Sequence, residues 1–175
     1  MIGGRAAAAR RLRCGVAALA ILGFAAGAHA QRLNEELDVG PWVIGNPANA
    51  NGRFSKCIAY TTLDSGDGVV GLVSDGTIVG LLLVRPGATA NLGARFNASY
   101  RFDGGAWTRT TGGVDAPDAL SLNVPGPSAS TLSAFAGVSQ VEIQMPNNVT
   151  ISSSLREVGP GIAALRRCVQ AGLGR

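Results

Sequence analysis

The chain has 175 residues, with 15 Lys and Arg against 11 Asp and Glu, and so carries a net charge of +4. Four arginines within residues 1–30 account for this whole surplus, and the rest of the chain is neutral. Binding to nucleic acids or to anionic membranes through a polybasic surface requires an excess of basic residues. From the composition we therefore expect neither a nucleic-acid partner nor binding to an anionic membrane through a polybasic surface.

Residues 1–30 have the pattern of a secretory signal peptide. Arginines at its start are followed by an apolar run over residues 15–28, and Ala28-His29-Ala30 forms an A-x-A cleavage site. A membrane-spanning helix needs about 20 apolar residues, more than this run supplies. We therefore expect cleavage after Ala30, a periplasmic or secreted protein, and no transmembrane segment in the mature chain.

Residues 31–53 are predicted to be an N-terminal segment followed by a loop. Residues 31–39 are polar, and residues 40–53 are rich in Gly, Pro, Asn and Ala, which is typical of a loop. Trp42 is the apolar anchor of this predicted loop. Because loops on a rigid scaffold often carry recognition residues, we take Trp42 and Arg53 as a candidate binding loop.

Residues 54–175 are predicted to form one β-rich domain with a C-terminal helix. Alternation of apolar and polar residues, typical of strands with one buried face, occurs at 57–62, 95–103, 120–124, 141–145 and 149–155. Residues 69–73 and 77–84 are two more apolar strands, and the second is apolar on both faces, as in the centre of a sheet. Helices are predicted near residues 130–136 and 160–171. The expected fold is a single antiparallel β-sandwich or barrel of seven to eight strands.

Two predicted hairpin turns indicate which residues of the flanking strands should pair. Asp75-Gly76 is a strong signal for a two-residue turn, which would place Ser74 opposite Thr77. Gly104-Gly105 would turn the chain so that Phe102 faces Trp107. This aromatic pair would lie in the core.

Two cysteines, Cys57 and Cys168, remain after the predicted signal peptide. In an oxidising compartment an even pair of cysteines predicts one disulfide, and two buried free thiols are the alternative. A bond between them would tie the C-terminal helix to the strand at residues 57–62. The chain-entropy estimate for a loop of roughly 110 residues is about 4–5 kcal/mol of stabilisation.

The sequence offers little catalytic chemistry. His29 is the only histidine and lies in the predicted signal peptide, so the mature chain would lack Ser-His, Cys-His and His-ligated metal sites. Lys56 is the only lysine, and its place beside Cys57 in a strand points it to solvent. A Ser–Lys pair or a pair of carboxylates stays open as a minor alternative. We expect no enzyme activity, no cofactor and no metal.

Three arginines are candidates for a polar contact surface: Arg95, Arg101 and Arg109. In an alternating strand, Arg101 shares one face with Asn97 and Ser99. An ordinary solvated sheet face is the alternative interpretation.

The order of several features resembles the invasion-associated locus B family of secreted bacterial proteins. These are an early tryptophan, Trp42, then Cys57-Ile58-Ala59, the Tyr-x-x-Asp-Gly-Gly hairpin from Tyr100 to Gly105, and Ala-Leu-Arg-Arg-Cys ending at Cys168. Family members often carry a cysteine just after the early tryptophan, where this chain has Val43. The resemblance implies a β-rich envelope or secreted domain without known catalysis, and some members are linked to host-cell invasion.

The sequence thus favours an exported bacterial protein that acts by binding another protein, in the envelope or on a host. The alternative is a periplasmic inhibitor of a hydrolase such as lysozyme or a protease, with residues 40–53 as the segment that plugs the target's cleft. The oligomeric state stays open.

Overall fold

The computed structural model describes residues 33–47 and 54–174, with the side chains of residues 33–35 excepted. The predicted signal peptide at 1–30 and Arg53 lie outside these residues. The elements in chain order are β1 (Leu33–Val39), β2 (Trp42–Pro47), β3 (Cys57–Thr62), β4 (Val69–Ser74), β5 (Val79–Val84), β6 (Arg95–Phe102), β7 (Thr108–Ala116), β8 (Ala119–Val124), α1 (Ser128–Phe135), β9 (Gln140–Gln144), β10 (Thr150–Ser154) and α2 (Val158–Leu173).

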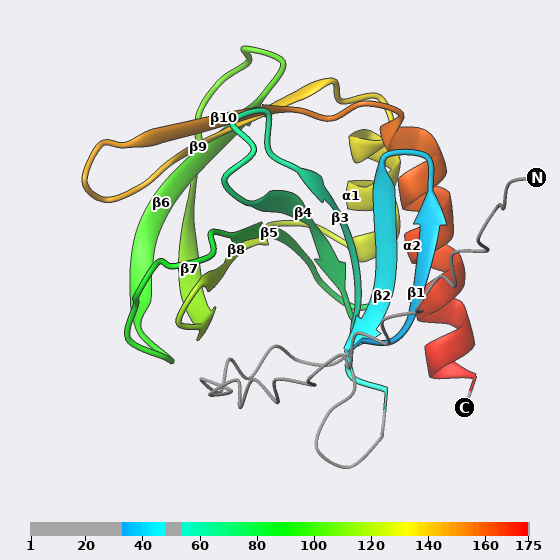
Figure 1. The fold of residues 1–175 in the computed structure, drawn as a ribbon. Coiled ribbons are helices and arrows are strands. Elements are labelled where there is room, and N and C mark those ends of the chain that lie inside the picture. Colours follow the sequence, from blue (N-terminus) through cyan, green and yellow to red (C-terminus); the bar gives the residue numbers. More distant parts are fainter. Residues whose placement is uncertain (1–32, 48–53, 175) are drawn as a thin grey trace, which may run out of the picture. The chain divides into compact units, whose positions relative to one another are not determined.

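All strands belong to one antiparallel sheet in the order β1-β2-β3-β4-β5-β8-β7-β6-β9-β10 (Figure 1). The predicted mainly-β class with two helices is confirmed. The described residues form ten strands rather than seven or eight, in one open sheet. As expected, β5 is central and buried on both faces, since only Val84 at its end is not fully buried.

The predicted N-terminal loop is wrong for residues 33–47, which form the hairpin β1–β2. Gly40, with a φ of 59°, makes the tight turn between the two strands. Trp42 and Ile44 then alternate inward from β2 and are both buried. The polar residues of this segment lie in β1, at the edge of the sheet, where charged side chains are tolerated and discourage pairing with other chains.

One face of the sheet, called here the helix face, packs against α1 and α2 and forms the hydrophobic core. Trp42 is 1% exposed, and its indole N–H donates to the carbonyl of Arg156 over 2.7 Å. Its ring lies against Gly161 of α2, where a Cβ would approach the indole Cγ to 2.7 Å. The glycine therefore lets the helix approach the tryptophan closely.

The Cys57–Cys168 disulfide joins β3 to α2, with the two Cα atoms 6.1 Å apart. This confirms the predicted pairing and the docking of the terminal helix on the sheet. Both helices begin two residues earlier than predicted, and α1 follows Pro127 without a side-chain cap. Ser130, the first residue of the predicted helix, does not cap it, because its hydroxyl donates to the Pro127 carbonyl.

Both predicted hairpin registers are corrected. Ser74 pairs with Val79, not with Thr77, because the Asp75 carboxylate accepts the backbone N–H groups of Thr77 and Ile78 and widens the turn. The observed register differs from the predicted one by two residues. Because side chains alternate between the two faces of a strand, each residue stays on the face predicted for it.

Between β6 and β7 the register differs from prediction by one residue, since Tyr100 pairs with Thr108. A one-residue slip moves a side chain to the other face of the sheet. Trp107 is therefore 39% exposed instead of lying in the core. Phe102 keeps its place on the helix face, where it packs edge-on against Phe135 of α1 with ring centroids 4.7 Å apart.

Candidate concave binding face

The second face of the sheet is strongly concave between β3 and β7. Lys56, at the start of β3, lies 3.9 Å from Asp115 of β7, although β4, β5 and β8 separate these strands in the sheet. Neighbouring strands rotate by roughly 20–25°, so four steps bring opposite corners of a coiled sheet toward one another. We call this surface the concave face.

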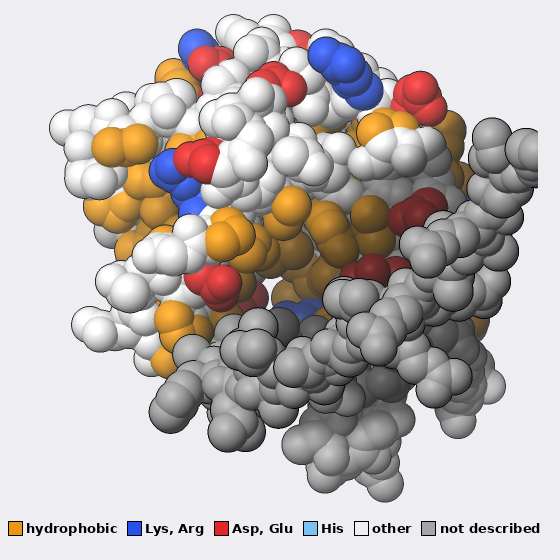
Figure 2. Space-filling view, in the orientation of Figure 1, with side chains coloured by type: hydrophobic (Ala, Val, Ile, Leu, Met, Phe, Trp, Pro, Cys, Tyr) orange, Lys and Arg blue, Asp and Glu red, His pale blue; other side chains and the backbone are white. Residues whose placement is uncertain are grey.

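The floor of the concave face is apolar and partly built from glycine. The strand registers place Ile58, Val73 and Leu82 on it, with Gly71 between them. A Cβ at Gly71 would lie 2.1 Å from the Ala59 carbonyl oxygen, so only glycine fits where β3 and β4 bend together. Figure 2 shows the hollow in the centre of the view, with hydrophobic side chains along its walls.

A hollow of about 400 Å³ lies at the end of this face near Lys56 and the β4–β5 turn, and we call it the trough. The residues that surround it come from the segment just before β3 and from β4 through β8, and they include Lys56, Val73, Arg95, Thr111 and Asn123. Lys56 lies on the opposite face from Cys57, as predicted, but its side chain is only 31% exposed because it reaches over the trough to Asp115. Thr111 and Asn123 line the β7 and β8 side of the trough.

The rim of the concave face toward β1 is acidic. The Tyr60 hydroxyl of β3 donates to Glu36 over 3.2 Å. Burial raises the pKa of Tyr60 above its ordinary value of 10.0, and the negative charges of Glu36 and Asp38 raise it further. Both carboxylates therefore act on the same side of the sheet as the tyrosine. This gives one rim of the concave face a negative potential.

The rim toward β6 carries the three predicted arginines, which the register places on one face. Arg101 is engaged by an ion pair with Glu142 of β9 and stacks over Trp107, with its guanidinium carbon 4.6 Å from the ring centroid. The bond to Glu142 raises the pKa of Arg101, so the guanidinium stays charged. Arg95 lines the trough and Arg109 lines a neighbouring polar hollow. The three arginines therefore do not form one patch, and only Arg95 belongs to the trough.

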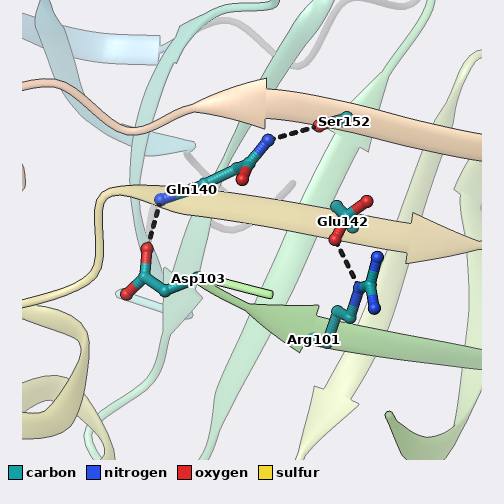
Figure 3. A network of polar contacts seen from close by, with 5 residues as sticks. All are labelled: Arg101, Asp103, Gln140, Glu142 and Ser152. Atoms are coloured by element: carbon teal, nitrogen blue, oxygen red, sulfur yellow. Dashed lines mark hydrogen bonds and ion pairs between the residues drawn. The ribbon is translucent and has the colours of Figure 1, made fainter. Parts of the chain in front are cut away.

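Polar contacts brace β6 against β9 and β10 next to this rim (Figure 3). The Asp103 carboxylate accepts the backbone N–H groups of Ser139 and Gln140, each over 2.9 Å. The Gln140 side-chain amide donates to the Ser152 hydroxyl over 3.0 Å. Together with the Arg101–Glu142 pair, these contacts hold the strand edges in register, which is a structural role.

The predicted binding loop is not supported by the structure at Trp42. That residue is buried between β2 and α2, and it cannot contact a partner. Sequence reasoning also missed Glu36, Asp38 and Asn123. Apolar residues on both faces of residues 77–84 are the signal that indicates a second apolar face.

Two aspartates should make the fold sensitive to acid. The Ser154 N–H and hydroxyl donate to Asp64, and the Ser139 hydroxyl and N–H donate to Asp103. These bonds hold the pKa of each carboxyl below its ordinary value of 3.8. A lowered folded-state pKa stabilises the fold above the unfolded value, and this contribution is lost as pH falls through the folded pKa.

We therefore expect the free energy of unfolding to fall as the pH drops below about 4. The double variant Asp64→Asn, Asp103→Asn should show a flatter decline. Urea unfolding in a series of buffers between about pH 6 and pH 2.5 measures this dependence. Identical slopes for wild type and variant would contradict the assignment to these two carboxyls.

No protein-family model, curated protein or solved structure matches the chain. Within residues 33–47 and 54–174, no group of three or more His, Cys, Asp or Glu side chains is arranged to hold a metal ion. Neither of the helices that the structure describes is long and apolar enough to cross a bilayer.

Proposed function

We propose that this is an exported, non-enzymatic binding protein that captures a convex segment of a partner protein in its concave face. The observation that carries the proposal is the trough itself, a hollow of about 400 Å³ in which apolar side chains such as Val73 and Ile78 lie among polar and charged ones. Lys56, one of its lining residues, forms an ion pair with Asp115 of β7. Buried apolar contact with charged groups at the rim is the usual arrangement of a protein-binding surface. Export, the signal peptide and likeness to the invasion-associated locus B family are parts of the same proposal.

The charges on the two rims give the partner a preferred orientation. Glu36 and Asp38 at the β1 rim attract basic groups, whereas Arg95 at the β6 side attracts acidic groups. Charge complementarity of this kind contributes mainly to specificity and to the association rate. The partner segment should therefore carry an apolar centre between a basic and an acidic end, and its association should slow as salt concentration rises.

Filling the trough should abolish capture of the partner. Asn123 is exposed at the trough and faces Thr111 across β7 and β8, so Asn123→Trp places an indole in the hollow. We expect this variant to weaken binding by at least about tenfold, since it occupies the space that the partner needs. Thr111→Trp is a second variant that tests the same space from the neighbouring strand.

The matched control is Ala163→Trp, which adds the same side chain at an exposed position of α2. Mature wild-type and variant chains serve as baits for envelope extract and culture medium, with bound proteins identified by mass spectrometry. Thermal unfolding checks that each variant folds. A partner held equally by wild type, Asn123→Trp and Thr111→Trp would contradict the proposal, as would a loss of binding caused by Ala163→Trp alone.

A further inference from the structure

A separate apolar pocket of about 410 Å³ opens on the helix face, where β5 and β8 meet the β9–β10 turn. Leu83 and Leu120 form its base, and Met145 and Ile151 come from the hairpin β9–β10. Val149, at the pocket's mouth, is 45% exposed. Its volume lies within the roughly 300–1,000 Å³ typical of small-molecule sites.

The walls of this pocket are held in place by backbone hydrogen bonds. The Arg85 N–H donates to the Asp118 carbonyl and the Ala90 N–H donates to the Pro117 carbonyl, both over 2.9 Å. The Met145 N–H donates to the Val149 carbonyl, also over 2.9 Å. Because both sides of the opening are fixed, a ligand would not have to order them, and a preformed site loses less entropy on binding.

One basic and one acidic side chain, Arg85 and Asp118, are among the residues that line the pocket. Arg85 lines it but is engaged by an ion pair with Asp67, and Asp118 adds a second carboxylate. An anionic head group would therefore find the one basic side chain of the lining already paired, and it would lie near the carboxylate of Asp118. A neutral head group can still form hydrogen bonds with these groups and with the side-chain amide of Asn147, another lining residue.

From these observations we propose that the pocket binds a small uncharged amphiphile, with an alkyl chain inside and a hydroxyl or similar neutral polar head at the Arg85–Asp118 rim. Met145 suits such a chain, because its flexible thioether side chain adapts to irregular apolar shapes. The site lies on the opposite face of the sheet from the trough. The two proposals therefore concern different sites, and a failure of the proposed partner capture would not affect the proposal for this pocket.

Met145 also provides a reporter inside the pocket. The chain has 2 methionines, Met1 and Met145, so a spectrum of the full chain labelled with ¹³C at the methionine methyls contains two signals. Met145→Leu assigns the pocket signal. Octan-1-ol is the neutral probe and sodium octanoate is its anionic counterpart. We expect octan-1-ol to shift the Met145 signal saturably, and octanoate to need at least about tenfold more ligand.

Ala90→Phe fills the pocket without changing the backbone bond that Ala90 makes, and Ala88→Phe does so from an exposed position. Each should raise the octan-1-ol concentration needed for half-saturation by at least about tenfold. Ala163→Phe, at an exposed position of α2, is the matched control and should titrate like wild type. The absence of a saturable shift, or wild-type titration by both filled variants, would overturn the site. Equal titration by octan-1-ol and octanoate would overturn the neutral head group.

Discussion

Replacing Trp42 with alanine is expected to lower the free energy of unfolding by about 3–5 kcal/mol, the range for truncating a large aromatic side chain in a core. Trp42 is 1% exposed and packs against Gly161 of α2, so its removal leaves a cavity between the hairpin β1–β2 and the terminal helix. It also leaves the Arg156 carbonyl without the indole donor that lies 2.7 Å away.

Trp107→Ala is the matched control for this prediction, because Trp107 is the second of the chain's 2 tryptophans and is 39% exposed. Its contact with Arg101 is a surface cation–π pair, which contributes roughly 0.5–1 kcal/mol. Urea unfolding followed by circular dichroism compares both variants with wild type. Equal losses for the two substitutions would contradict the assignment of Trp42 to the core and Trp107 to the surface.

Removing the Cys57–Cys168 disulfide is expected to have an effect of similar size. The two cysteines are 111 residues apart in the sequence, and closing so long a loop restricts the unfolded chain strongly. The chain-entropy model gives about 4–5 kcal/mol for a loop of this length. The double variant Cys57→Ser, Cys168→Ser should lose that amount of stability while keeping its β-rich circular dichroism spectrum.

Wild type unfolded in the presence of a reductant should match the double variant, which separates loss of the covalent bond from any effect of the serine side chains. A change in the free energy of unfolding below about 1 kcal/mol would show that the bond contributes little to stability. A reduced wild type more stable than the double variant would instead assign part of the loss to the hydroxyl that Cys57→Ser places in the core.

Alternating patterns predicted those elements whose two faces differ in polarity. β6 alternates as expected, with Ala98 and Tyr100 buried between more exposed polar residues. The pairing of Cys57 with Cys168 followed from their being the two cysteines left after the predicted signal peptide. These features depend on local sequence and on counting, so no knowledge of the tertiary structure was needed.

Register and edge position were harder to predict. The Asp75 carboxylate binds two backbone N–H groups and widens a turn that the dipeptide alone suggested to be tight. The hairpin β1–β2 was missed because the sequence of β1 is acidic, and its edge position, which tolerates such residues, depends on the rest of the sheet.

The concave face could not be predicted because it depends on twist accumulated over several strands. The contact of Lys56 with Asp115 links residues that are distant both in sequence and in strand order. Alternation in the sequence shows which side chains share a face, but it does not show whether that face curves inward. The candidate residues chosen from sequence, Trp42 and the arginines, were therefore only partly those that the concave face uses.

Site-specific photocrosslinking tests the central claim most directly. A photoreactive benzoyl-phenylalanine at Asn123 lies in the trough, and the same group at Ala163 lies on exposed α2. Illumination of producing cells should give a discrete adduct with one partner protein from position 123 and none from position 163. Adducts formed only from position 163, or no adduct from position 123, would contradict a protein-binding role for the concave face.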